Sequence, residues 1–101
     1  MTTPFRLDGL RALVTGGTRG IGRAIVETLA DEGAAVAFCA RTAADVARAA
    51  EDMTGRGCMV TGCCVDVSDE ASVRQWVGDT AAELGGLDIV VANVRDRKSV
   101  V

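Results

Sequence analysis

The chain has 101 residues, of which 49% are hydrophobic and 3% aromatic, and it carries a formal net charge of −3 at pH 7. This length allows at most one domain with a small core, and the apolar content favours a globular fold over disorder. The negative charge argues against a nucleic-acid binder, and without a bilayer-spanning apolar run or a signal-peptide core we expect a cytoplasmic protein with no membrane partner.

Strand and helix patterns alternate from the start of the chain. The apolar run 10–15 predicts a buried strand, and apolar residues at helical spacing predict a helix from about residue 21 to 32. Gly33 follows that helix, as glycine commonly does at a C-terminal cap. The continuous apolar run 35–40 then predicts a second strand that is covered on both faces.

The alternation continues in the second half of the chain. Thr42 is predicted to cap a second helix that ends at the Gly-Arg-Gly sequence 55–57, and residues 58–65 predict a third strand. Ser68 is predicted to cap a third helix, which ends at Gly85. The residues of this helix that recur at helical spacing, and so mark its face toward the sheet, are Val73, Trp76, Val77, Thr80, Ala81 and Leu84.

Residues 87–92 predict a fourth strand, so that four strands are separated by three helices. This order predicts an α/β fold of the Rossmann type, namely the first half of a doubly wound parallel sheet with strand order 3-2-1-4. The first two helices would cover one face of the sheet and the third helix the other. The fourth strand would leave an apolar edge of unpaired backbone groups, so we expect the 101-residue chain to be poorly soluble and marginally stable.

A glycine-rich turn separates the first strand from the first helix, in the segment 12–22 (ALVTGGTRGIG). A helix N-terminus offers unpaired backbone N–H groups and partial positive charge, which together favour a phosphate. Gly16, Gly20 and Gly22 lack a Cβ, so the backbone can turn sharply there and approach a pyrophosphate closely. The sequence of strand, turn and helix therefore predicts a nucleotide phosphate site.

Three segments of this chain resemble motifs of the short-chain dehydrogenase/reductase family, which includes the 3-oxoacyl-acyl-carrier-protein reductases. The glycine turn is similar to the family's cofactor motif, the segment 65–69 (VDVSD) to its adenine-contacting segment, and the segment 88–93 (DIVVAN) to its fourth strand. The resemblance implies an oxidoreductase that transfers hydride between a nicotinamide cofactor and a carbonyl or alcohol substrate, and a homo-oligomer for a full-length form. The predicted cofactor-binding residues are Gly16, Thr18, Arg19, Gly20, Ile21, Gly22, Arg41, Asp66, Val67 and Asn93.

The end of the second strand bears on the choice between NAD and NADP. An NAD site places an acidic residue there to accept hydrogen bonds from the ribose 2′-hydroxyl, whereas this chain has Ala40 followed by Arg41. A guanidinium can bind a 2′-phosphate through charge-assisted hydrogen bonds, and Arg19 could approach the same phosphate from the glycine turn. We therefore predict NADP(H), the alternative being that both arginines are solvated loop residues. Arg23, one turn into the helix, is predicted to be a plain surface residue.

By the same resemblance, Asp66 would accept a hydrogen bond from the adenine amino group, with the Val67 backbone beside the ring. The alternative role of Asp66 is to form the turn before Ser68, for which aspartate is also suited. Asn93 would lie at the C-terminal end of the fourth strand, where ligands bind in open α/β sheets, or else be an ordinary turn residue. Trp76 is predicted to pack in the core.

The residues that carry the chemistry of the family are missing from these 101 residues. The family uses a serine and a Tyr-x-x-x-Lys pair, in which tyrosine is the general acid/base, but this chain has no tyrosine, no histidine and one lysine, Lys98. We therefore predict no catalytic residue and expect this chain alone to be inactive. Two alternatives stay open, a nucleotide-binding module with a regulatory or interaction role and a different Rossmann family such as a methyltransferase.

The similarity stops after Asn93, where the Asn-Ala-Gly turn of the family is replaced by residues 94–101 (VRDRKSVV). Residues 96–101 match one reading frame of a widely used sequencing adapter, in which a stop codon follows directly. We therefore expect a partial dinucleotide-binding domain over residues 1–95 and a tail over residues 96–101 that is not native. The alternative is a basic tail that binds an acidic partner.

The four cysteines lack the spacing of a metal site. None belongs to a Cys-x-x-Cys pair and no histidine is present to complete a zinc site, so we predict no bound metal. Cys39 is predicted to be a small core residue, and the adjacent Cys63 and Cys64 are expected to face opposite sides of their strand. A redox or metal role is the less favoured alternative.

Overall fold

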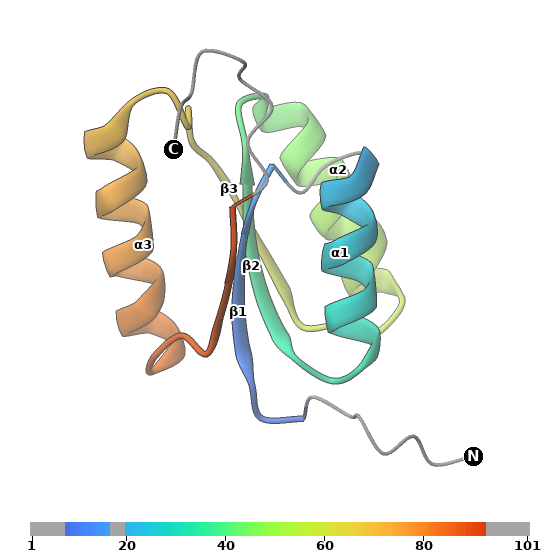
Figure 1. Ribbon diagram of the computed structural model, residues 1–101. Helices are drawn as coiled ribbons and strands as arrows, with labels where there is room; N and C mark the ends of the chain where they lie inside the picture. The colour runs from blue at the N-terminus through green and yellow to red at the C-terminus, as the bar shows by residue number, and fades with distance from the viewer. Residues whose placement is uncertain (1–7, 17–19, 93–101) are drawn as a thin grey trace.

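A computed structural model describes residues 8–16 and 20–92 of the chain. They form a parallel sheet of four strands with helices on both faces (Figure 1). The elements are β1 (Arg11–Thr15), α1 (Gly20–Asp31), β2 (Ala35–Ala40), α2 (Ala43–Gly55), β3 (Val60–Cys64), α3 (Glu70–Leu84) and β4 (Ile89–Val91). None of the helices in the described ranges is long and apolar enough to cross a membrane.

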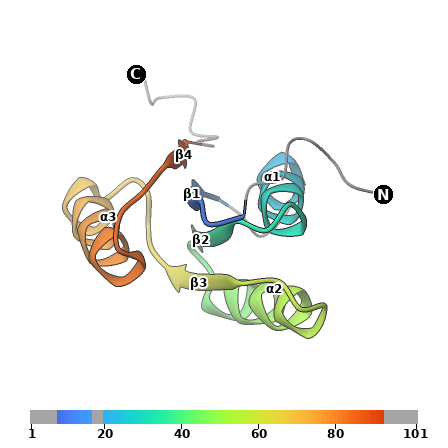
Figure 2. The ribbon, with the colours of Figure 1, turned by 90° about the horizontal axis from the view of Figure 1, so that it is seen from below.

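The strands lie in the order β3-β2-β1-β4, and every neighbouring pair is parallel. This order confirms the predicted Rossmann-type sheet, in which a helix connects each strand to the next. Figure 2 shows that α1 and α2 lie on one face of the sheet and α3 on the other. β1 is central, and its Leu13 is level with Ala37 of β2 and Val90 of β4. Because all four strands run the same way, their carboxyl ends meet at one edge.

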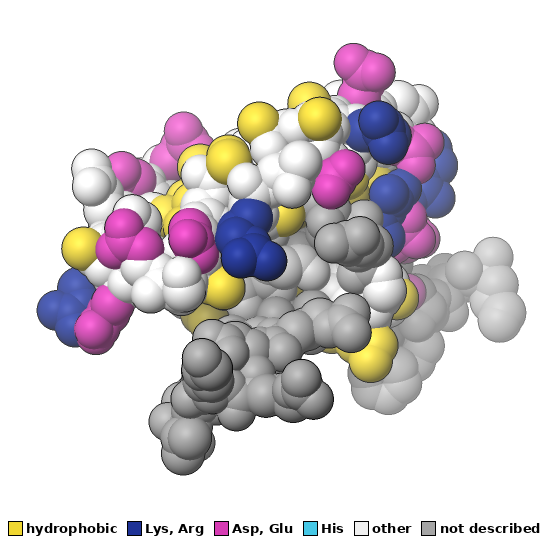
Figure 3. All heavy atoms as spheres, turned by 90° about the horizontal axis from the view of Figure 1, so that it is seen from above, with side chains coloured by type: hydrophobic (Ala, Val, Ile, Leu, Met, Phe, Trp, Pro, Cys, Tyr) yellow, Lys and Arg dark blue, Asp and Glu magenta, His cyan; other side chains and the backbone are white. Residues whose placement is uncertain are grey.

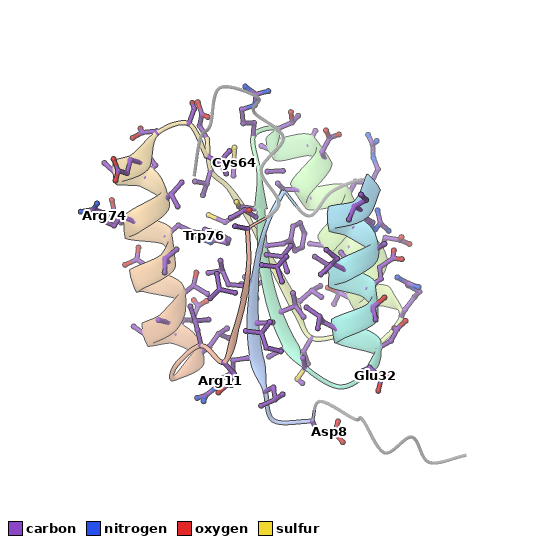
Figure 4. The ribbon with its side chains drawn as sticks, viewed as in Figure 1. Asp8, Arg11, Glu32, Cys64, Arg74 and Trp76 are labelled. Atoms are coloured by element: carbon purple, nitrogen blue, oxygen red, sulfur yellow. The ribbon has the colours of Figure 1, made fainter. Side chains whose placement is uncertain are left out.

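β1 and β2 are buried on both faces, which is why each is an unbroken apolar run in the sequence. Alternate residues enter separate cores: Val14 and Phe38 pack under α1 and α2, whereas Leu13 and Cys39 pack under α3. Trp76 of α3 is only 7% exposed and fills this second core (Figure 4). The predicted packing roles of Cys39 and Trp76 are therefore confirmed.

β3 and α2 approach each other closely at Gly62. A Cβ built on Gly62 would lie 2.6 Å from Val46 Cγ1 and 2.9 Å from Phe38 Cζ. Val46 belongs to α2 and Phe38 to β2, and both are members of the core on this face. The missing side chain at residue 62 therefore lets α2 pack directly against the sheet.

One of the two predicted helix N-caps is wrong and the other is confirmed in position. The N-cap of α3 is Asp69 and not Ser68, because the Asp69 carboxylate accepts the backbone N–H of Ser72 at 3.3 Å. The Ser68 hydroxyl donates instead to the Asp66 carboxylate at 2.7 Å, so it is not available to the helix. Thr42 does occupy the N-cap position of α2, but its side chain makes no capping hydrogen bond.

Arg11 fixes the C-terminal end of α3 to the sheet. Gly85, the predicted terminal glycine, adopts the left-handed conformation (φ 84°), and its carbonyl accepts a hydrogen bond from Arg11 Nη1 at 2.8 Å. Arg11 Nε forms an ion pair with Asp88 Oδ2 at 3.0 Å, and the Asp88 backbone N–H donates to the Arg11 carbonyl at 2.8 Å. One side chain thus joins the start of β1 to the turn between α3 and β4.

Arg23 is not the plain surface residue that the sequence predicts. Its Nε donates to Glu27 Oε2 on the same helix at 2.8 Å, and its guanidinium also pairs with Asp52 of α2. Glu27 in turn pairs with Arg56, just after α2, at 3.2 Å. These four charged side chains connect α1 to α2 on the surface above their shared core.

The strands at the two edges of the sheet are shorter than predicted. β3 covers residues 60–64 and β4 residues 89–91, whereas the apolar patterns extend over 58–65 and 87–92. In the described ranges each of these strands has a neighbour on one side only. Within the described residues β4 pairs with β1 alone, and its Val90 is 60% exposed. β4 thus presents an unpaired apolar edge, as predicted.

Candidate functional site

The predicted site residues that the structure describes lie at the carboxyl edge of the sheet, at the top of Figure 1. Gly16 follows β1, Arg41 follows β2, and Asp66 comes two residues after β3. Because these strands are parallel neighbours, the three positions share one edge. The first turn of α1 adds Gly20, Ile21 and Gly22 to this edge.

Gly16 and Gly20 lie at the end of β1 and at the start of α1. Gly16 (φ 70°) and Gly20 (φ 63°) both adopt the left-handed conformation that favours glycine. The Gly16 backbone N–H donates to the carbonyl of Cys39 at 2.9 Å, which fixes the turn to β2. A Cβ built on Gly20 would meet nothing within 4 Å. The backbone N–H groups of the first turn of this 12-residue helix therefore fit a phosphate.

The two residues after Gly20 differ in exposure. Ile21 is 74% exposed, whereas Gly22 is buried on the inner side of α1. Gly22 therefore serves helix packing, which is compatible with the third glycine of a dinucleotide turn. Three further predicted site residues lie outside the described residues, and their roles stay predictions: Thr18, Arg19 and Asn93.

Arg41 is an exposed residue, and two hydrogen bonds from the end of β3 hold its backbone and that of the preceding residue. Its carbonyl accepts a hydrogen bond from Cys64 Sγ at the end of β3, at 3.1 Å. The Val65 backbone N–H donates to the preceding carbonyl, that of Ala40, at 2.9 Å. The contact with Cys64 is a feature that the sequence reasoning missed. It depends on the strand register, which pairs Ala40 with Cys64, and aligning the ends of the two apolar runs is the signal that could have found it.

Asp66 forms a compact turn with Ser68. Its Oδ1 accepts both the Ser68 hydroxyl at 2.7 Å and the Ser68 backbone N–H at 3.0 Å. These two hydrogen bonds, the hydroxyl first, hold the pKa of the exposed Asp66 carboxyl below its usual range, and the positive charge of Arg41 lowers it further. The turn-forming role left open for Asp66 is therefore observed, and its contact with adenine stays a prediction.

Val67 is half-buried and packs against the core under α3. Its side chain therefore anchors the loop after β3 to the body of the protein. The contact between its backbone and adenine stays a prediction.

Charged side chains of both signs lie on the face of the molecule that contains the carboxyl edge. Figure 3 looks down on it and shows basic and acidic side chains interspersed on the described part of the surface. A shallow depression of about 510 Å³ lies beside α3, but it is lined by Glu70, Ala71, Arg74 and Gln75 and includes none of the predicted site residues. The depression is therefore not the predicted cofactor site, and the role of the edge between Gly16, Arg41 and Asp66 stays a prediction.

The described residues do not bring together a metal-binding set. No three histidine, cysteine, aspartate or glutamate side chains gather there in a suitable group. The four cysteines are free thiols, and burial raises the pKa of the Cys39 thiol, which makes the reactive thiolate scarce at that position.

Comparison with known proteins assigns the sequence to a family. The profile of the family described as short chain dehydrogenase matches residues 11–96. A tropinone reductase homolog of Arabidopsis thaliana is 48% identical over 92 residues, which are 89% of this chain and 28% of that protein. The isoepoxydon dehydrogenase of Penicillium expansum is 38% identical over 93 residues, 86% of this chain and 35% of that protein. The chain thus spans about a third of the length of these curated relatives.

Solved structures share the fold. A short-chain dehydrogenase/reductase from Serratia marcescens superposes with a TM-score of 0.82 and 38% identity, over 96% of this chain and 42% of that one. A variant of actinorhodin polyketide ketoreductase, described with NADPH, superposes with a TM-score of 0.79 and 31% identity, over 83% of this chain and 32% of that one.

Proposed function

The chain belongs to the short-chain dehydrogenase family, and on that premise we propose that it supplies the cofactor-binding part of an NADP(H)-dependent oxidoreductase. The observation that carries the choice of cofactor is the exposed Arg41 directly after β2, next to Ala40, which stands at the predicted position of the acidic residue in an NAD site. The actinorhodin ketoreductase, a structural neighbour described with NADPH, supports the same choice.

Each part of the carboxyl edge would bind one part of the dinucleotide. The start of α1, with Gly16 and Gly20, would hold the pyrophosphate. Arg41 would bind the ribose 2′-phosphate through charge-assisted hydrogen bonds, and Asp66 would accept a hydrogen bond from the adenine amino group. The remaining predicted residues, Thr18, Arg19, Ile21, Gly22, Val67 and Asn93, would complete the site.

The bound nicotinamide would exchange hydride with a carbonyl or alcohol carbon of a small-molecule substrate. These 101 residues contain no tyrosine and no histidine, so we propose that the proton-transfer residues lie outside them and that this chain alone has no turnover. For the longer form we propose a cytoplasmic homo-oligomer. Residues 1–95 would be its partial dinucleotide-binding domain, and residues 96–101 would not belong to the native protein.

Titration of the chain with NADPH and NADH tests the choice of cofactor. We expect tighter binding of NADPH by roughly tenfold or more, because a hydrogen bond to a charged group contributes about 1.5–3 kcal/mol. Arg41→Asp should reverse the preference for NADPH, since the new carboxylate repels a 2′-phosphate and accepts a hydrogen bond from the ribose 2′-hydroxyl of NADH. Arg48→Asp, the same charge change at an exposed position of α2, should leave the preference unchanged. Tighter binding of NADH by the unmodified chain would refute the assignment.

A nucleotide-binding module with a regulatory or interaction role is the second candidate, and the missing tyrosine is what favours it. The two proposals differ in the coding sequence that follows the codon for Asn93. A Tyr-x-x-x-Lys sequence encoded downstream supports the oxidoreductase. Genomic sequence that runs through residues 96–101 to a stop codon supports the module.

A further inference from the structure

Both donors of Ser68 meet one oxygen of Asp66. The hydroxyl donates to Oδ1 at 2.7 Å and the backbone N–H donates to the same Oδ1 at 3.0 Å. Elsewhere in the described part of the chain, no group donates a hydrogen bond to the second oxygen, Oδ2. Within these residues one carboxylate oxygen is therefore engaged and the other accepts no hydrogen bond.

Ser68 is also the main restraint on this side chain. Asp66 is exposed, so it lacks the close packing that fixes a buried side chain. A freely rotating carboxylate would lose side-chain entropy on binding a ligand, whereas two hydrogen bonds to one oxygen orient the group beforehand. The serine is free for this task because Asp69, and not Ser68, caps α3.

The position of the pair suits the adenine end of a dinucleotide. Asp66 comes two residues after β3 and Arg41 directly follows β2, and these two strands are parallel neighbours, so the two residues share one edge of the sheet. A free carboxylate oxygen beside the residue proposed for the 2′-phosphate is an acceptor for an amino donor on the attached base.

We propose that Ser68 is a positioning residue for adenine recognition: it holds Asp66 Oδ1 so that Oδ2 accepts the 6-amino group of the base. The inference rests on the proposed function and adds to it a residue outside the predicted set. It also explains why the site would distinguish adenine from a base with a carbonyl at the same position. A carbonyl oxygen facing a carboxylate oxygen brings two acceptors together with no hydrogen between them.

The test compares NADPH with its hypoxanthine analogue, which carries a carbonyl oxygen in place of the 6-amino group and a hydrogen on the adjacent N1, and is otherwise the same. The unmodified chain should bind NADPH roughly tenfold more tightly than the analogue, which is the size expected for a hydrogen bond to a charged group. Ser68→Ala should reduce this ratio at least about threefold, and Ser68→Thr, which keeps the hydroxyl, should preserve it. An NMR titration should show the pKa of Asp66 rising in Ser68→Ala.

Ser72→Ala is the matched control. It removes a serine hydroxyl that donates to a neighbouring aspartate, Asp69, at 2.9 Å, but it does not touch Asp66. It should leave the NADPH-to-analogue ratio unchanged. Asp66→Ala gives the ratio expected when the acceptor is absent, and circular dichroism verifies that each variant is folded.

The possible failures can be told apart. If Ser68→Ala keeps the full ratio while Asp66→Ala abolishes it, the positioning role of Ser68 is wrong. If the unmodified chain binds both dinucleotides equally, the adenine contact is wrong although the proposed function stands. If the folded chain binds neither dinucleotide, the proposed function is wrong and this inference falls with it.

Discussion

Gly62 and Gly78 occupy opposite environments. A side chain at residue 62 would collide with the core, since its Cβ would come within 2.6 Å of Val46 Cγ1. A side chain at residue 78, on the exposed face of α3, would meet nothing within 4 Å. The same chemical change at the two positions should therefore have opposite effects on stability.

We expect Gly62→Ala to lower the free energy of unfolding by about 1–3 kcal/mol, the usual size of overpacking in a dense core. Gly78→Ala should raise it by about 0.5–1 kcal/mol, because alanine loses less backbone entropy than glycine in a helix. Urea denaturation followed by circular dichroism measures both. Equal effects of the two substitutions would contradict the packing described for α2 and β3.

Single residues also show where prediction from the sequence stops. The glycine turn was predicted from its place between a strand and a helix, and Arg41 and Asp66 were predicted with the help of the resemblance to the family's cofactor motifs. The choice between Ser68 and Asp69 as helix cap was missed, because both are good caps. What decides it is the carboxylate of Asp66, which accepts the Ser68 hydroxyl, and such a contact depends on the path of the loop after β3.

At the scale of elements, Arg11 and Asp88 connect two strands with the end of α3. The Arg11 Nε and backbone N–H both donate to Asp88 Oδ2, at 3.0 and 2.8 Å. These donors, the guanidinium first, hold the pKa of the Asp88 carboxyl below its usual range. A carboxyl whose pKa is lower in the folded than in the unfolded state stabilises the fold while it is ionised.

The contribution of Asp88 should accordingly depend on pH. It should be fully present above the unfolded pKa of about 3.9 and disappear as the pH falls through the lower pKa of the folded state. We expect Asp88→Asn to destabilise the chain at pH 7 and the difference from the unmodified chain to shrink below about pH 4. Unfolding transitions over a pH series measure this, with Asp79→Asn on the exposed face of α3 as the control. A difference that stays constant down to about pH 2 would show that Asp88 does not act through its charge.

The ion pairs around α1 and α2 show which contacts between elements can be predicted from the sequence and which cannot. Glu27 lies four residues after Arg23, so their pairing can be read from helical spacing. Asp52 and Arg56 come from a different helix and the turn after it, and their part in the cluster depends on how α1 and α2 lie beside each other. Sequence patterns find helices and strands well, but they miss contacts that require two elements to be placed first.

At the scale of the whole molecule, the strand order was predictable from the sequence, and this order places β4 at one edge of the sheet. Alternating strands and helices with right-handed crossovers leave few possible strand orders, and the observed order is the expected one. The full geometry of the cofactor site was not predictable, because it depends on the loops at the carboxyl edge, of which residues 17–19 and 93 lie outside the described part.

The edge strand β4 should control how the 101-residue chain associates. Its Val90 is 60% exposed, and its outer edge pairs with nothing in the described ranges. Val90→Lys should reduce association, because a charge on an apolar edge opposes pairing with a second chain. Sedimentation at increasing protein concentration measures the effect. Thr61→Lys on the opposite edge strand β3 is the control, and an equal effect of both substitutions would contradict a specific role of β4.

The central place of β1 also has a consequence for the growing chain on the ribosome. Of the four described strands β1 is made first, and each later one can add to an edge that already exists: β2 to β1, β3 to β2, and β4 to the other side of β1. A nascent chain that reaches only α2 already has the glycine turn between β1 and α1. Arg41 gains its support from Cys64 when β3 is complete, and Asp66 follows two residues later. The turn proposed for the phosphate is therefore made first and the side proposed for adenine last.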